Sequence, residues 1–260
     1  GVGMAPDHGS DPDALVQHAD IALYSAKHGG KQTYRLFEPR LMEAIQRRRS
    51  LEASLRRASM RNEFRIVYQP VFSSAQGEIT GAEALLRWTC PQHGEISPTE
   101  FIPIAEQCGL IENLGYYVLK EACRAATNEL QGLTVSVNVS AVQVQFGRFL
   151  VDLKSLLQEY KLPPQLLELE ITESVIIDDP DQALEMLTAI RETGVRLALD
   201  DFGTGFSSLS YLARLPFDTL KIDRYFVLTM DRDEGSAKIV RSVVNLGRDL
   251  SLEVVAEGVE

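Results

Sequence analysis

Two adjacent aspartates, Asp200 and Asp201, end an apolar stretch that begins at Leu197, and the glycines Gly203 and Gly205 follow them. Neighbouring ionised carboxylates repel each other, and removing them from water is costly. A fold therefore rarely places two of them at the end of a strand without a cation. A divalent metal ion would offset both penalties, so the pair indicates a metal site.

Oxygen-bearing side chains follow apolar stretches at four further places along the chain: Glu83, Asn138, Glu170 and Glu257. In a parallel barrel, the carboxyl ends of the strands meet at one rim and carry the active site. The recurrence therefore predicts a metal site at the rim of such a barrel, of the kind that activates water.

Composition and charge narrow the class of protein. The chain has 260 residues, of which 45% are hydrophobic and 24% are charged, as in an ordinary soluble globular protein. No apolar run reaches the roughly 18 residues of a membrane span and no signal peptide opens the chain, so we expect a cytoplasmic segment without membrane contact. The net charge of −11 argues against binding to a nucleic acid polymer. The odd number of cysteines, without CxxC spacing, disfavours disulfides and zinc.

Alternating strand and helix patterns predict the fold class. The expected strands are 64–72, 78–88, 133–140, 166–173, 196–202, 219–227 and 252–257. The first two are joined by a short turn near Gly77 and should be antiparallel, whereas helical patterns separate most of the others, as in parallel βαβ units. We predict an α/β fold: a TIM-like (β/α)8 barrel whose first strand is antiparallel and whose last strand is missing.

Helix signals mark the other elements. Ser97-Pro98-Thr99-Glu100 predicts a capping box, and Asp179-Pro180 predicts the start of a helix that Gly194 ends. A first helix is expected from Asp11-Pro12 to Lys27, followed by a short strand, Tyr34–Phe37. The arginine-rich helix from Leu41 to about Arg61 is interpreted as a solvated linker.

The order of these motifs resembles one known family. The signature Glu83-Ala84-Leu85 is that of the EAL domain, a cyclic-di-GMP phosphodiesterase. It is followed, in the family's order, by Val137–Ser140, Glu170–Glu173, Asp200–Gly205, Lys221–Asp223 and Ala256–Glu260.

The beginning of the chain is similar to a second family. Ala19–Lys27 with Gly29, Gly30 and Lys31 resembles the C-terminal end of a GGDEF domain, the diguanylate cyclase, whose signature loop would lie upstream. The resemblance implies a fragment of a tandem GGDEF–EAL protein: a remnant of an α/β GGDEF domain at 1–40, a linker helix at 41–62, and an EAL domain at 63–260 that lacks the family's last strand.

The resemblance to the EAL family also implies an activity and a cofactor. The enzyme hydrolyses cyclic di-GMP to linear pGpG in bacterial second-messenger signalling, using two Mg²⁺ or Mn²⁺ ions. The first ion would be held by Glu83, Asn138, Glu170 and Asp200, and the second by Asp200, Asp201 and Glu257. Hard oxygen ligands of this type suit both metals.

Further roles follow from the same resemblance. Lys221 would act on the attacking water, with Glu257 as a second catalytic residue, although a lysine paired in a barrel core is the alternative for Lys221. The substrate-binding residues would be Gln69, Arg87, Asp223 and Glu260, of which Asp223 and Glu260 could instead be simple ion-pair partners. Glu173 would anchor the loop Gly203–Ser208. Members of the family often form homodimers.

Three other functions are alternatives to the phosphodiesterase. Asp201-Phe202-Gly203 matches the magnesium motif of kinases, but no GxGxxG loop or His-Arg-Asp sequence accompanies it. An inert EAL module could act as a cyclic-di-GMP receptor, or as a dimerising signalling scaffold. All the family's metal ligands within this span are kept, which favours the enzyme.

Overall fold

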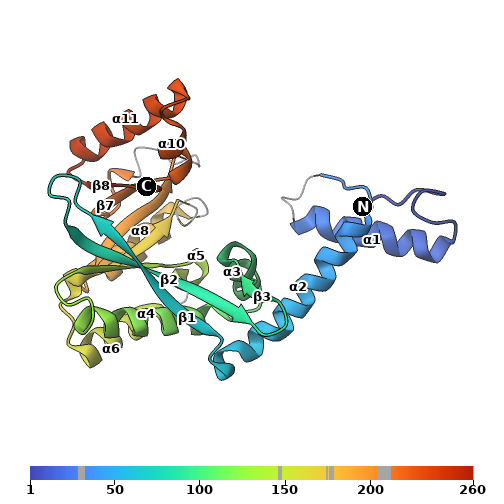
Figure 1. Ribbon diagram of the computed structural model, residues 1–260, viewed down its shortest axis with the longest axis horizontal. Helices are drawn as coiled ribbons and strands as arrows, with labels where there is room; N and C mark the ends of the chain where they lie inside the picture. The colour runs from blue at the N-terminus through green and yellow to red at the C-terminus, as the bar shows by residue number, and fades with distance from the viewer. Residues whose placement is uncertain (29–32, 146–147, 174, 176–178, 204–211, 260) are drawn as a thin grey trace. The chain divides into compact units, whose positions relative to one another are not determined.

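The computed structural model describes residues 1–28, 33–145, 148–173, 175, 179–203 and 212–259 (Figure 1). The chain forms two compact units, Gly1–Glu63 with Thr89–Cys108, and Phe64–Trp88 with Gly109–Glu260. Among the helices within these described ranges, none is both long and apolar enough to cross a membrane.

The first unit is mainly helical. It contains α1 (Pro12–His28), α2 (Pro39–Ala58), the 3-10 turn η1 (Ser59–Arg61), the short strand β3 (Gly94–Ile96) and α3 (Pro98–Gln107). The expected first helix is confirmed, and the helix expected from Leu41 to about Arg61 is present as α2 with η1 after it. The role of α2 as a linker stays a prediction. The strand expected at Tyr34–Phe37 is reduced to a single parallel bridge between Val2 and Leu36. The strand β3 was not predicted, because three residues carry too little periodicity.

The capping box predicted before α3 does not form. Ser97 is the N-cap residue, as expected, but its side chain makes no capping hydrogen bond and instead contacts Thr99 Oγ1 at 2.8 Å. The carboxylate of Glu100 accepts two hydrogen bonds from Arg47 of α2, at 2.5 and 2.9 Å. A charged partner therefore takes the carboxylate that the capping box would have used.

The second unit is built on a curled sheet. Its strands are β1 (Phe64–Phe72), β2 (Ile79–Cys90), β4 (Thr134–Asn138), β5 (Leu167–Thr172), β6 (Arg196–Phe202), β7 (Thr219–Ile222) and β8 (Glu253–Ala256). They pair in the order β1-β2-β4-β5-β6-β7-β8. As predicted, β1 is antiparallel to β2, and the following pairs are parallel. This α/β architecture is consistent with a TIM-like barrel, in the form of a half-barrel.

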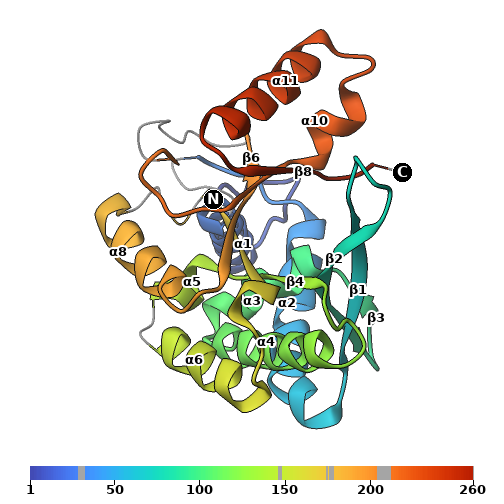
Figure 2. The same cartoon turned by 90° about the vertical axis from the view of Figure 1, so that its left-hand side faces the viewer.

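Helices connect the parallel strands and lie outside the curl (Figure 2). They are α4 (Ile111–Thr127), α5 (Ala141–Gln145), α6 (Arg148–Tyr160), η2 (Pro164–Leu166), α8 (Pro180–Arg191), α10 (Arg224–Thr229) and α11 (Glu234–Asp249). The N-cap predicted at Asp179 is confirmed, because its side chain accepts the backbone N–H of Gln182. The strand predicted at 219–227 ends at Ile222, since Asp223 accepts the Tyr225 N–H and starts α10.

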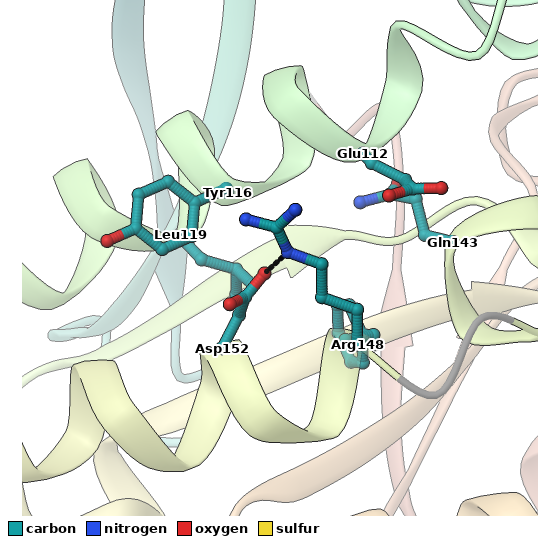
Figure 3. A pocket seen from close by; sticks show the side chains of 7 residues that line it. Glu112, Tyr116, Leu119, Gln143, Arg148 and Asp152 are labelled. Atoms are coloured by element: carbon teal, nitrogen blue, oxygen red, sulfur yellow. Dashed lines mark hydrogen bonds and ion pairs between the residues drawn. The ribbon is translucent and has the colours of Figure 1, made fainter.

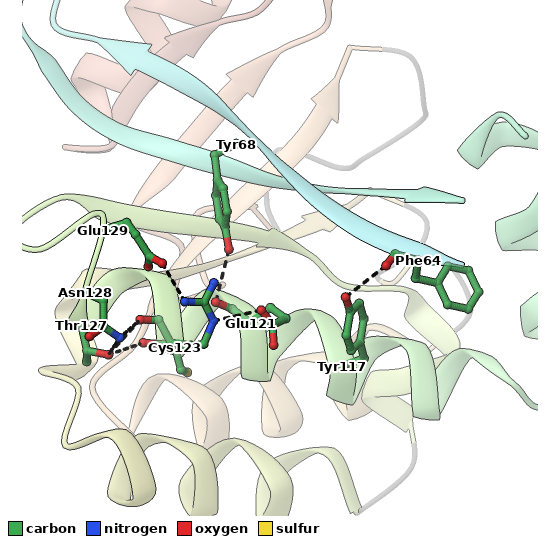
Figure 4. Close-up of polar contacts among 9 residues, drawn as sticks. Phe64, Tyr68, Tyr117, Glu121, Cys123, Thr127, Asn128 and Glu129 are labelled. Atoms are coloured by element: carbon green, nitrogen blue, oxygen red, sulfur yellow. Dashed lines mark hydrogen bonds and ion pairs between the residues drawn. The ribbon is translucent and has the colours of Figure 1, made fainter. Parts of the chain in front are cut away.

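Two tyrosines attach α4 to the antiparallel strand β1 (Figure 4). The hydroxyl of Tyr68 donates to the Glu121 carbonyl oxygen at 3.2 Å, and that of Tyr117 donates to the Phe64 carbonyl oxygen at 3.4 Å. Burial raises the pKa of Tyr68 to about 12, so its hydroxyl stays a donor at neutral pH. These bonds hold β1 in place beside β2, which carries Glu83.

Candidate active site

A buried lysine lies at the centre of the predicted site. The side chain of Lys221 on β7 is only 5% exposed. Its Nζ lies 2.6 Å from Glu170 Oε2 and 2.8 Å from Glu257 Oε1. Asp200 Oδ1 and Glu83 Oε2 lie 3.3 and 3.8 Å from the same nitrogen. Four carboxylates from β2, β5, β6 and the residue after β8 therefore converge on one ammonium group.

The register of the sheet brings these residues together. Asn138 pairs with Glu170 across β4 and β5, and Thr172 pairs with Asp200 across β5 and β6. The amide of Asn138 also donates to Glu83 Oε1 at 2.6 Å, which connects β4 to β2. Asn138, Glu170 and Asp200 come from the carboxyl-terminal parts of parallel strands, as the sequence predicted. Glu83 does not end its strand, because β2 continues to Cys90.

Asp200, Asp201 and Glu257 form an acidic cluster beside the lysine. Each offers a carboxylate oxygen within 4.8 Å of the others. Asp201 has a positive φ of 56°, which is uncommon for a residue other than glycine, and its backbone N–H donates to Asp200 Oδ1 at 2.9 Å. Such backbone strain is typical of functional sites.

The electrostatics show an excess of negative charge. Burial would lower the pKa of Lys221, but the surrounding carboxylates outweigh it and raise that pKa above its ordinary value. Burial raises the pKa of Glu170 and of Glu257, against the attraction of Lys221. Burial, with the charge of Asp200, raises the pKa of Asp201 to about 6. One lysine thus does not neutralise the five acids.

The residues fit a pair of hard divalent cations. The donors are carboxylate oxygens and the amide oxygen of Asn138, and no thiol or imidazole is among the described residues of the cluster. Five carboxylates and one ammonium leave four formal negative charges, which two divalent ions would balance. The identity of the metal does not follow from these donors, because Mg²⁺ and Mn²⁺ both prefer oxygen.

The predicted substrate-binding residues that the structure describes lie in two places. Gln69 is exposed and pairs directly with Glu83 across β1 and β2, so both share one face of the sheet. Arg87 follows Glu83 by four residues on that face, and its guanidinium donates to the Leu86 carbonyl oxygen at 3.1 Å. Asp223 caps α10 and helps to raise the pKa of Asp201, which places it near the acidic cluster.

The remaining predicted residues concern the loop and the end of the chain. Glu173, the predicted loop anchor, is buried directly after β5. Most of the loop Gly203–Ser208 lies outside the described residues, and so does Glu260. The roles assigned to them therefore stay predictions.

One set of polar residues was not predicted to be part of the site. Glu168, Arg196, Thr219 and Glu253 form a second polar group on β5 to β8. Glu168 lies two residues before Glu170, a spacing that an ordinary paired strand residue also explains. A signal for this group was present in the sequence, because each member precedes a residue of the lysine cluster by two or four positions.

A pocket elsewhere on this unit lies between the outer helices α4, α5 and α6 (Figure 3). It is lined by Glu112, Tyr116, Leu119, Gln143, Arg148, Phe149 and Asp152. The ion pair between Arg148 and Asp152 partly fills it, at 3.2 Å. None of the carboxylates around Lys221 lines this pocket, so it is separate from the candidate active site.

The chain is similar over its whole length to curated proteins of known sequence. An uncharacterised signalling protein of Caulobacter vibrioides is 45% identical over 260 residues, all of this chain and 32% of its own length. The bifunctional diguanylate cyclase/cyclic di-GMP phosphodiesterase MucR of Pseudomonas aeruginosa is 41% identical over 264 residues, all of this chain and 38% of its own. The chain thus spans about a third of the length of these relatives.

A solved structure supports the fold. The PaMucR phosphodiesterase in complex with c-di-GMP matches with a TM-score of 0.78 and 44% identity, over 81% of this chain and 87% of that one. Homologues therefore include cyclic-di-GMP phosphodiesterases. The family model of the EAL domain matches residues 52–260. With its sheet, its lysine-centred carboxylates and this match, the chain belongs to the EAL domain family.

Proposed function

We propose that this chain hydrolyses cyclic di-GMP to linear pGpG with the help of two divalent metal ions, Mg²⁺ or Mn²⁺. The observation that carries the proposal is the convergence of Glu83, Glu170, Asp200 and Glu257 on the buried Lys221. Relatives that are named as cyclic di-GMP phosphodiesterases give further support. The negatively charged site of this chain would need cations to accept an anionic substrate.

The residues that would hold the metals are those of the cluster. Glu83, Asn138, Glu170 and Asp200 would bind one ion, and Asp200, Asp201 and Glu257 would bind the other. When bound, the ions would lower the pKa of water and stabilise charge on the phosphoryl oxygens. Asp200 is the natural shared ligand, because it lies beside both Lys221 and Asp201.

Lys221 and Glu257 would have different roles toward the attacking water. Lys221 stays protonated among its carboxylates, so it can orient an attacking water by donating a hydrogen bond but cannot accept its proton. Glu257 lies 2.8 Å from Lys221, and burial raises the pKa of its carboxyl group. It can therefore accept the proton of a water that Lys221 holds.

The substrate would lie over the face shared by Gln69 and Arg87. Arg87 is a half-buried residue, and its guanidinium would make a charge-assisted contact with a phosphate oxygen. Gln69, opposite Glu83, could contact a guanine edge or the ribose. Asp223, and Glu260 beyond it in the chain, would add acceptors for the donors of guanine.

The second part of the proposal concerns residues 1–40. We infer that residues 1–40 are the end of a GGDEF domain, joined to the EAL domain by α2. The match to MucR, which is named as bifunctional, extends over all of this chain. The helix α1, packed on α2, would then belong to the cyclase half.

The test compares the purified protein with its Glu83→Ala variant. The wild type with Mn²⁺ should convert cyclic di-GMP to pGpG, as followed by chromatography, and chelation should stop it. Glu83→Ala should lose hydrolysis by at least about 100-fold, because it lacks a ligand. It should still bind cyclic di-GMP in calorimetry, since Arg87 and Gln69 remain.

Binding of cyclic di-GMP by both proteins without any hydrolysis by the wild type would favour a receptor instead. If the metal-loaded wild type neither binds nor hydrolyses cyclic di-GMP, the result would favour a dimerising signalling scaffold. Undiminished turnover after exhaustive chelation would contradict the metal-dependent mechanism.

A further inference from the structure

A second polar layer connects four strands of the sheet through one arginine. We call Glu168, Arg196, Thr219 and Glu253 the arginine layer. Arg196 Nε donates to Glu168 Oε1 at 3.1 Å. Its Nη2 donates to Thr219 Oγ1 at 3.1 Å and to Glu253 Oε2 at 2.7 Å. The hydroxyl of Thr219 also donates to Glu168 Oε1, at 2.6 Å.

The arginine layer and the lysine cluster share the same strands. On β5, Glu168 precedes Glu170 by two residues, and on β7 Thr219 precedes Lys221 by two. On β6, Arg196 precedes Asp200 by four residues, and Glu253 on β8 precedes Glu257 by four. Even spacings keep side chains on one face of a strand.

The backbone register supports the same relation. Glu168 is the register partner of Arg196, and Thr219 is the partner of Glu253. One guanidinium, from the strand that carries Asp200, thus contacts β5 and β7, which carry Glu170 and Lys221, and β8, which Glu257 directly follows.

The hydrogen bonds of the arginine layer hold its side chains in fixed positions. Glu168 is buried, its side chain being 12% exposed, and it accepts hydrogen bonds from both Arg196 and Thr219. The planar guanidinium has donors in fixed directions, so it can hold several partners in one geometry. Removing one partner of a buried ion pair leaves a costly uncompensated charge.

We propose that Arg196 is a positioning residue for the metal ligands. It fixes β5, β7 and β8 relative to β6, so that Glu170, Lys221 and Glu257 remain within reach of Asp200. Its effect on hydrolysis rests on the proposed function, whereas its effect on metal binding does not.

The test is the Arg196→Met variant, which keeps most of the side-chain volume and removes the charge and the donors. Calorimetric titration with Mn²⁺ should show about tenfold weaker binding, as expected when groups that support metal ligands are lost. With cyclic di-GMP, kcat should fall about tenfold while KM changes less than about twofold, because Arg87 and Gln69 are untouched. Arg196→Lys should recover part of both losses, since it keeps the charge but not the fork.

A matched control separates positioning from general destabilisation. Arg191→Met removes the ion pair between Arg191 and Asp218, whose atoms lie 2.8 Å apart. The two arginines are comparable in exposure, because the Arg191 side chain is 41% exposed and that of Arg196 is 31% exposed. Arg191→Met should lower the thermal midpoint yet keep the Mn²⁺ affinity of the wild type. If Arg196→Met does not fold, Glu253→Gln serves instead, because its side chain is 62% exposed, and it should also weaken Mn²⁺ binding.

Wild-type Mn²⁺ affinity in the folded Arg196→Met or Glu253→Gln variant would overturn the positioning role, and so would equal losses in Arg191→Met. A wild type that binds Mn²⁺ but hydrolyses nothing would refute the proposed function alone. The comparison of Mn²⁺ affinities would then still decide the role of Arg196.

Discussion

Asp201 combines backbone strain with charge repulsion at one residue. Its φ of 56° lies in the left-handed region, and its carboxylate lies next to those of Asp200 and Glu257. Neither feature stabilises the fold without a cation. Both are expected where a ligand compensates for them, because strained and charged positions gather at functional sites.

Asp201 should make the stability of the metal-free protein depend on pH. Its pKa of about 6 lies above the ordinary value of 3.8. The stabilisation that arises from protonating it is fully present below about pH 4 and is lost as the pH rises through about 6. In chelator, the wild type should therefore lose stability relative to Asp201→Asn between pH 4 and 7.

Denaturant unfolding of both proteins across that range measures the difference. Asparagine tolerates the left-handed backbone, so the variant isolates the charge. A difference in unfolding free energy that stays constant with pH would show that Asp201 titrates normally. With saturating Mn²⁺ at pH 7, the wild type should instead have the larger unfolding free energy of the two proteins.

Two ligand variants should differ in severity. Asp200→Asn should reduce kcat by about 100-fold and Asn138→Asp by about tenfold. Asp200 contacts both Lys221 and the Asp201 N–H, whereas Asn138 contacts Glu83 and remains an oxygen donor as aspartate. Steady-state assays at saturating Mn²⁺ check the order. An equal loss in both variants would contradict a shared role for Asp200.

At the scale of elements, periodicity identified the sheet but not every boundary. The strands β1 and β6 were predicted at their observed bounds. Most residues of β6 are buried, so its apolar run marks the strand, whereas β1 has no buried residue and is marked instead by its β-branched and aromatic residues. The strand at 219–227 was drawn too long, since the apolar residues after Asp223 belong to α10. Local capping by Asp223 decided that boundary, and an apolar run does not reveal it.

Two helix starts that look alike in sequence should respond differently to mutation. Asp179→Ala should destabilise the protein by about 1 kcal/mol, because its side chain accepts the Gln182 N–H at the start of α8. Ser97→Ala should cost much less, since Ser97 makes no capping hydrogen bond to α3. Urea unfolding of both variants gives the two values, and a larger cost for Ser97→Ala would contradict the observed caps.

At the scale of the whole second unit, the candidate site connects distant parts of the sheet. Glu83 lies on β2, near one end of the strand order, and Glu257 directly follows β8 at the other end. Lys221 contacts both. Asn138, Asp200 and Glu257 were predictable from strand ends, whereas Glu83 lies inside β2 and was found through its signature motif. For the arginine layer the sequence offers only the spacing of its members, because ion pairing across four strands depends on a register that the sequence does not display.

Metal binding should therefore stabilise the curled sheet as a whole. An ion that binds only the folded state at 100 times its Kd adds about 2.7 kcal/mol. For a protein of this size, the thermal midpoint should rise by about 5–10 °C. Hydrogen exchange should slow most in β8, whose residues are half-buried or exposed and which pairs only with β7 among the described strands.

Glu257→Gln provides the control, because it removes the ligand next to β8 while leaving the pairing of β8 with β7 intact. In this variant, metal should no longer slow hydrogen exchange in β8. It should still slow exchange in part in β4 and β5, next to Asn138 and Glu170. Metal-induced protection confined to β4 and β5 in the wild type would mean that Glu257 does not bind an ion. The site would then be a one-sided cluster around Glu83, and would not connect the two ends of the sheet.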